Sequence, residues 1–89
     1  MTNVKKHQLE QAFKGSLDKY LFERWYDHYT IQRIKYDVNQ VYRDLLFETK
    51  EIKVDMDSDN SLRVIVLDTD GDWFNVHLAN QSVEFKDLK

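Results

Sequence analysis

The stretch LRVIVLDTDGDWFNVHLA, residues 62–79, decides the fold class of this 89-residue chain. It consists of two runs rich in β-branched and aromatic residues on either side of the dipeptide Asp70-Gly71. A dipeptide of this kind between two apolar runs is a strong signal for a two-residue hairpin turn. The stretch therefore predicts two antiparallel strands, over residues 61–69 and 73–79.

Two more strands extend this hairpin to a four-stranded antiparallel meander over residues 50–86. Apolar and charged residues alternate over 50–57, which is typical of a half-buried strand, and a short strand is expected over 82–86. The dipeptides at 59–60 and 80–81 are expected to form the other turns. Because residues directly opposite each other lie on one face of a sheet, these loop lengths fix the register and the core face. The residues predicted on the core face are Ile52, Val54, Met56, Ile65, Leu67, Phe74, Val76, Leu78, Val83 and Phe85.

The N-terminal part, residues 2–47, is predicted to form two or three helices packed on that face of the sheet. The whole chain is then a single α+β domain. The first helix is expected to begin at Thr2 or Asn3 and to end near Gly15, since glycine commonly follows the C-terminus of a helix. A second helix is expected over residues 17–28.

A third helix is predicted from an apolar stripe in which spacings of three and four residues alternate. The stripe consists of Ile31, Ile34, Val38, Val41 and Leu45. A strand over 30–38 is the alternative, because Ile34, Tyr36 and Val38 also occur at every second position. A continuous helix through the second and third segments would be about 45 Å long, too long for this domain, so a break is expected near 29–30.

The predicted register leaves an unusual surface on the side of the sheet away from the helices. The residues on this side are Leu62, Val64, Val66, Trp73, Asn75 and His77. A sheet that is covered on one side normally carries polar residues on the other. Two interpretations stay open: the first helix covers this side, or another protein chain does. In the second case these residues, apart from Asn75, are predicted to bind a partner.

The second predicted helix carries more aromatic residues than one buried stripe requires. That stripe is supplied by Leu17, Leu21 and Trp25. Phe22, Arg24 and Tyr26 lie at its edge or beyond it, and aromatic residues and arginine dominate the binding energy of protein interfaces. We therefore predict that these three residues bind a partner. An ordinary wet boundary, in which tyrosine hydroxyls reach water, is the alternative.

The acidic stretch DMDSDNSLRV, residues 55–64, raises the question of a calcium site. It places carboxylates at the first, third and fifth positions of a calcium loop, but the twelfth position is Val66, where a bidentate glutamate is needed. The flanking residues also alternate like strands, whereas calcium loops of this kind join helices. A second acidic loop at 68–72 lies on the order of 25 Å away, at the other end of one strand, so the two cannot share an ion. The sequence therefore predicts polar turns here.

Catalytic and metal-binding residues are scarce in this chain. Its three histidines, His7, His28 and His77, do not have the spacing of a metal site, and there is no cysteine. The serines occupy cap or turn positions, and no glycine-rich loop is available to hold a phosphate. We therefore expect a non-catalytic protein that uses no metal, no cofactor and no small-molecule substrate.

The net charge of −3 is unevenly distributed. Residues 1–50 have nine Lys and Arg against seven Asp and Glu, a net of +2, whereas residues 51–89 have four against nine, a net of −5. Nucleic-acid binding requires a broadly basic surface and is not expected. No apolar run reaches the ~20 residues of a membrane span. The lack of cysteine and of an apolar signal region predicts a cytoplasmic protein.

Together these features favour a small protein-interaction module: an adaptor, inhibitor or regulatory subunit that binds another protein or itself as a homodimer. The alternative is a nucleic-acid-linked role. In one version the acidic end of the sheet imitates a row of phosphates. In the other, basic residues of the helical part contact phosphates and bases. Those basic residues are Lys5, Lys6, Lys14, Arg24, Arg33 and Lys35.

Overall fold

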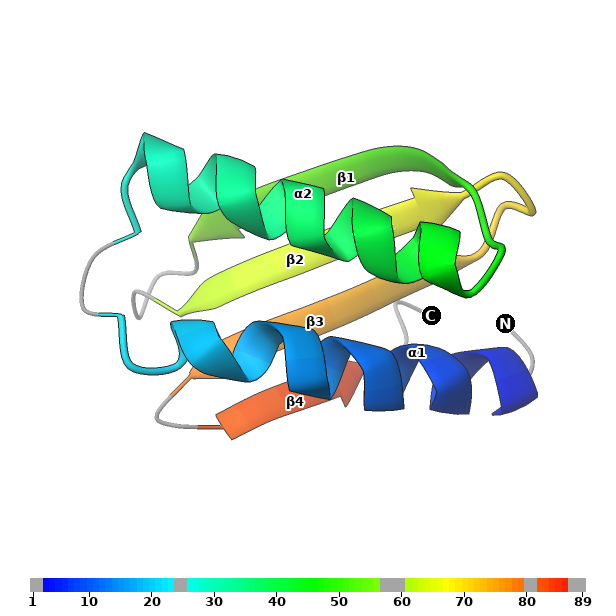
Figure 1. Cartoon of the computed structure of the whole chain (residues 1–89), viewed down its shortest axis with the longest axis horizontal. Helices are drawn as coiled ribbons and strands as arrows, with labels where there is room; N and C mark the ends of the chain where they lie inside the picture. The colour runs from blue at the N-terminus through cyan, green and yellow to red at the C-terminus, as the bar shows by residue number, and fades with distance from the viewer. Residues whose placement is uncertain (1–2, 24–25, 57–60, 80–81, 87–89) are drawn as a thin grey trace.

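The computed structural model describes residues 3–23, 26–56, 61–79 and 82–86, in which it shows two α-helices and a four-stranded antiparallel sheet (Figure 1). The helical elements are α1 (Asn3–Leu17), the short 3-10 helix η1 (Asp18–Tyr20) and α2 (His28–Asp44). The strands are β1 (Thr49–Met56), β2 (Leu62–Asp68), β3 (Trp73–Ala79) and β4 (Ser82–Lys86), and they lie in this order in the sheet. The predicted α+β fold with a β-meander is confirmed.

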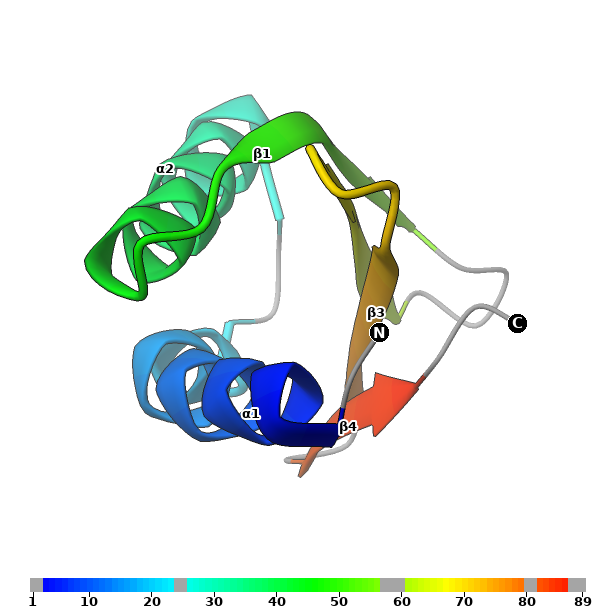
Figure 2. The ribbon, with the colours of Figure 1, turned by 90° about the vertical axis from the view of Figure 1, so that its right-hand side faces the viewer.

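The molecule has two layers, one of helices and one formed by the sheet. Both helices lie on the same side of the sheet, and its opposite side faces away from them (Figure 2). Three aromatic rings join the parts of the fold between these layers. The ring centroid of Phe13 in α1 lies 5.7 Å from that of Tyr42 in α2 and 5.2 Å from that of Phe74 in β3. All three side chains are fully buried. Burial of one such side chain contributes about 1.5–3 kcal/mol, so this contact holds the two layers together.

Helix α1 does not end at Gly15, as predicted, but continues to Leu17. The reason is its buried stripe: Leu9, Phe13 and Leu17 are spaced by four residues and are all fully buried. A glycine inside a helix costs about 1 kcal/mol relative to alanine. Burial of Leu17 outweighs this cost, so the helix continues through the glycine.

The predicted second helix over 17–28 is wrong. After α1 the chain passes through η1, and none of the described residues 21–23, 26 and 27 belongs to a helix before α2 begins at His28. The aromatic residues of this segment anchor the connection instead: the hydroxyl of the buried Tyr20 donates to Asp37 Oδ2 in α2 at 2.5 Å. The hydroxyl of Tyr26 donates to the Tyr20 carbonyl oxygen at 2.9 Å. These bonds give Tyr20 and Tyr26 a structural role in the connection without a helix.

Helix α2 confirms the predicted third helix and excludes the alternative strand over 30–38. It begins at His28, slightly before the predicted break. Asp27 caps it, because the Asp27 carboxylate accepts a hydrogen bond from the Thr30 backbone N–H at 2.8 Å. This hydrogen bond lowers the pKa of Asp27. The buried residues of α2 are Ile34, Val38, Val41 and Tyr42.

The hairpin between β2 and β3 differs from the prediction by one residue. Leu67 lies opposite Trp73, and three residues, 69–71, form the loop. The Gly71 N–H donates to the Asp68 carbonyl at 3.2 Å, and the Asp68 N–H donates to the Asp72 carbonyl at 3.0 Å. Gly71 has a φ of 83°, the left-handed conformation that closes a three-residue hairpin loop. The dipeptide Asp70-Gly71 therefore marks a turn, but not the two-residue turn that was predicted.

A shift of one residue turns every side chain of a strand to the opposite face. The pairing with β1 is shifted in the same way, since Val54 lies opposite Val64. As a result Leu62, Val64 and Val66 face the helices and are fully buried. The predicted positions of β2 side chains are therefore wrong on both faces. The predicted register between β3 and β4 is confirmed by the pairs Val76–Phe85 and Leu78–Val83.

Candidate functional site

The side of the sheet that faces away from the helices, called the outer face below, is not covered by any described helix (Figure 2). The register gives its residues in rows that cross the strands. One row contains Leu67 opposite Trp73, and the next contains Lys53, Ile65 and Asn75 side by side. A third row contains Asp55, Arg63, His77 and Glu84. The outer face thus changes from apolar at one end of the sheet to ionic at the other.

The apolar end of the outer face is formed by Ile65, Leu67 and Trp73, called the apolar patch below. All three side chains are partly exposed, and Trp73 keeps 40% of its surface accessible. A pocket of about 480 Å³ lies at this end of the face and is lined by Glu51, Lys53, Ile65 and Trp73. Contiguous exposed apolar residues rimmed by charges are typical of protein-binding surfaces.

The ionic end contains a salt bridge between neighbouring strands. Arg63 donates to both carboxylate oxygens of Asp55, from Nε at 3.0 Å and from Nη2 at 2.8 Å. The hydrogen bonds from Arg63 lower the pKa of Asp55. This paired geometry fixes both side chains on the outer face. His77 and Glu84 complete the row on β3 and β4.

Asn75 is the buried polar residue of the outer face, with 5% of its surface accessible. Its Nδ2 lies 3.4 Å from Nε2 of His77, the next outward residue on β3. Within the described ranges its Oδ1 has no hydrogen-bond partner. An amide oxygen that is buried without a partner costs roughly 1–3 kcal/mol of stability.

The outer face holds only part of the predicted surface. Trp73 and His77 lie on it as predicted. Leu62, Val64 and Val66 were predicted there but lie in the core, because the register is shifted, and as fully buried residues they cannot contact a partner. Their places on β2 are taken by Arg63, Ile65 and Leu67. The sequence signal for these residues was the continuous apolar run of β2, which does not distinguish one face from the other.

The three residues predicted to bind a partner through a second helix are not on a helix. Phe22 lies in the turn after η1 and is largely exposed. Tyr26 is half-buried and packs against the core. Arg24 lies outside the described residues. Phe22 lines a hollow of about 400 Å³ with Leu21 and Val83, away from the apolar patch.

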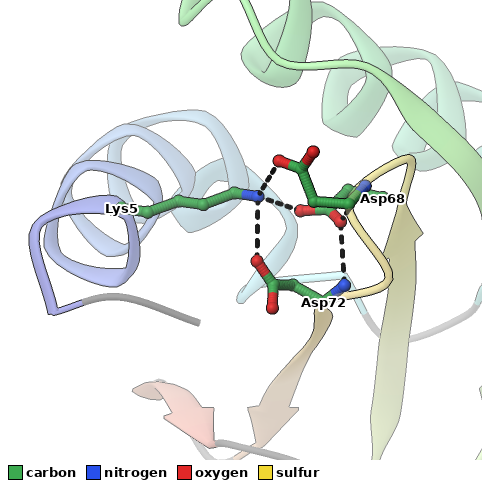
Figure 3. Close-up of polar contacts among 4 residues, drawn as sticks. Lys5, Asp68 and Asp72 are labelled. Carbon is green, nitrogen blue, oxygen red and sulfur yellow. Dashed lines mark hydrogen bonds and ion pairs between the residues drawn. The ribbon is translucent and has the colours of Figure 1, made fainter.

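A charged cluster joins the N-terminal end of α1 to the hairpin between β2 and β3 (Figure 3). The Lys5 amine forms an ion pair with Asp68, and its Nζ lies 3.2 Å from Asp72 Oδ2 and 3.3 Å from Asp70 Oδ2. Lys5 and Asp68 are both buried. The Lys5 amine also lies 5.0 Å from the centre of the Phe47 ring. We call Lys5, Asp68, Asp70 and Asp72 the Lys5 cluster.

The geometry of the Lys5 cluster explains why these charges can be buried. Asp68 Oδ1 accepts hydrogen bonds from the backbone N–H groups of Asp70 at 3.0 Å and Asp72 at 2.9 Å. Burial by itself would lower the pKa of Lys5, but the hydrogen bonds and charges of Asp68, Asp72 and Asp70 outweigh it and raise that pKa. The three carboxylates lie close enough together to hold a cation. The Lys5 ammonium is that cation in this structure.

The Lys5 cluster was not predicted from the sequence, because Lys5 and Asp68 are 63 residues apart in the chain. One signal was present: Lys5 precedes Leu9, Phe13 and Leu17 at the same spacing of four residues, which places it on the buried stripe of α1. A lysine on a buried stripe predicts an acidic partner, because charged side chains are rarely buried unless they are paired. Its position also removes Lys5 from the residues available to a nucleic acid.

Comparison with protein-family models, with curated proteins and with solved structures finds no match to this chain. Neither of the two described α-helices is long and apolar enough to cross a membrane. Function must therefore be inferred from the surfaces themselves.

Proposed function

We propose that this protein is a small non-catalytic protein-interaction module, and that the outer face of its sheet is the binding surface. The observation that carries the proposal is the apolar patch of Ile65, Leu67 and Trp73 on a side of the sheet that no described helix covers. Such a module would act as an adaptor, an inhibitor or a regulatory subunit.

A second copy of the chain is the partner that this surface favours. The outer face carries charges of both signs, with Glu51, Asp55 and Glu84 against Lys53 and Arg63. A two-fold axis places the same surface on both partners, so the surface must complement itself. A face with mixed charges can pair acidic with basic groups under such an axis, whereas a face of one sign would repel its copy.

The size of the surface sets the expected strength of this dimer. Four strands about 4.8 Å apart and seven residues at about 3.3 Å each give a face of roughly 19 by 23 Å. Its area, on the order of 400 Å², is about half of what each partner buries in an interface of standard size. We therefore expect a weak dimer that forms at high micromolar protein concentration.

Sedimentation velocity over a range of protein concentrations tests this proposal. The unmodified protein should form dimers as its concentration rises, and Ile65→Lys should remain a folded monomer. Val4→Lys is the matched control, because Val4 is 71% exposed on α1, outside the outer face. This variant should dimerise like the parent. A parent that stays monomeric at the highest concentration, or an Ile65→Lys variant that still dimerises, would overturn the assignment of this partner.

A further inference from the structure

The side of α2 opposite the core carries a row of five residues along the whole length of the helix. They are Tyr29, Arg33, Tyr36, Gln40 and Arg43. Their spacings of four, three, four and three residues place them on one side of a helix. The buried residues of α2 lie on the other side. We call these five residues the tyrosine–arginine stripe.

The two tyrosines of the stripe are exposed and yet held in place. Tyr29 keeps 68% and Tyr36 63% of its surface accessible. The Arg33 guanidinium lies over the ring of Tyr29, 5.9 Å from its centre, and Gln40 Nε2 donates to the Tyr36 hydroxyl at 3.0 Å. Side chains that are already ordered lose less conformational entropy when a partner binds. The stripe is thus prepared for contact with another molecule.

The charge of the stripe is positive. It contains two guanidinium groups and no carboxylate. Across the described part of the chain, neither Arg33 nor Arg43 forms an ion pair. Two acidic residues of α2 lie beside the stripe. Asp37 is engaged by Lys19 Nζ at 2.9 Å and by the Tyr20 hydroxyl, and Asp44 is exposed at the C-terminal end of the helix. Both arginines therefore remain available to carboxylates of a partner.

We propose that the tyrosine–arginine stripe binds an acidic amphipathic helix of another protein. Alternating spacings of three and four residues place the stripe in one line along α2, and a second helix can lie along such a line. Tyrosine and arginine are enriched in protein interfaces, and a guanidinium can bind both oxygens of a glutamate. A nucleic acid fits less well, because two arginines on a chain of net charge −3 give little neutralisation of phosphates.

This surface is separate from the outer face of the sheet, since the helix layer and the outer face lie on opposite sides of the molecule (Figure 2). Both surfaces can therefore be occupied at once. A chain that dimerises through its sheet would present two such stripes, which is the arrangement of a bivalent adaptor.

Binding of two designed helical peptides tests this inference. One peptide carries leucines at alternating three- and four-residue spacings with flanking glutamates, and the matched peptide has lysine in place of every glutamate. Measured by fluorescence anisotropy, the glutamate peptide should bind at least about tenfold more tightly than the lysine peptide. Arg33→Glu combined with Arg43→Glu should reverse this preference. Lys14→Glu, at an exposed position of α1 outside both the stripe and the outer face, is the control and should leave it unchanged.

Two results would overturn the inference. The first is equal binding of both peptides, or a preference that the double variant does not change. The second is tighter binding of a single-stranded DNA oligonucleotide than of the glutamate peptide, which would assign the stripe to nucleic acid. Circular dichroism of the double variant shows whether α2 is intact. If it is not, Tyr36→Ala provides the second test, since this variant should weaken binding of the glutamate peptide severalfold.

Discussion

The two faces of strand β2 have similar residues and different roles. Val64 faces the helices and is fully buried, whereas Ile65, its neighbour, faces outward and is half-buried. Both are β-branched and apolar, so their chemistry does not separate them. Their surroundings do: one side is covered by two helices, and no described helix lies over the other. Apolar residues on a strand therefore indicate folding or binding only when the face that they occupy is known.

The largest expected difference between the two faces is the loss of stability caused by a substitution to lysine. Val64→Lys would place an unpaired charge in the core, which costs several kcal/mol and is comparable with the whole stability of a small domain. In Ile65→Lys the amine can reach water, so the cost should be about 1 kcal/mol. Thermal unfolding followed by circular dichroism measures both. Equal melting temperatures would show that the register of β2 is misassigned.

A smaller loss of stability is expected from the Lys5 cluster. Lys5→Met keeps the length of the side chain but leaves Asp68 buried without its cation, which should cost about 3–5 kcal/mol in urea unfolding. Lys6→Met is the control on the same helix, where Lys6 is about one-third exposed and pairs with Glu10 at 3.9 Å. It should change stability by less than ~0.5 kcal/mol. Similar effects of the two variants would contradict the structural role of Lys5.

The salt bridge on the outer face should contribute only ~0.2–1 kcal/mol, because both side chains are about one-third exposed. The pKa of Asp55 is lowered in the folded protein from its usual value of 3.8. The stability from this pair is therefore present above that value and is lost as the pH falls through the folded pKa. Asp55→Asn should be less stable than the parent at pH 7 and equally stable near pH 2. If the variant is also less stable than the parent near pH 2, the loss of stability comes from packing and not from the salt bridge.

Calcium is expected to have the smallest effect. The 55–64 stretch lacks a closing glutamate, although residues 57–60 lie outside the described residues. In the other acidic loop, the Lys5 ammonium occupies the space among the carboxylates. Millimolar calcium should therefore leave the melting temperature unchanged. An increase of several degrees that Asp70→Asn abolishes would show that calcium displaces Lys5.

Local signals predicted much of this fold. The apolar stripe of α2, the four strands and the register of β3 against β4 follow from spacing and turn length alone. The faces of β2 could not be predicted, because the strand is apolar on both sides and the loop before β3 has three residues rather than two. The segment 17–28 has helical spacing, but a spacing pattern does not reveal the contact of Tyr20 with Asp37 of α2, which holds the chain in the short helix η1 instead.

The residues of the candidate site were predicted only in part, because the register of β2 was not predicted correctly. The prediction placed Trp73 and His77 correctly on the outer face, because they alternate along β3 with the buried residues Phe74, Val76 and Leu78. Ile65 and Leu67 were missed with the register of β2. The tyrosine–arginine stripe was not recognised, because its residues had first to be separated from the buried side of α2.

The central claim is that the outer face binds a second copy of the chain while the inner face maintains the fold. A dilution series of ¹H–¹⁵N spectra of the unmodified protein tests it most directly. As the concentration rises, the signals of Ile65, Leu67 and the Trp73 indole should shift together, while those of Phe22 and Tyr36 stay constant. Concentration-dependent shifts confined to α2, or none up to millimolar protein, would contradict this account.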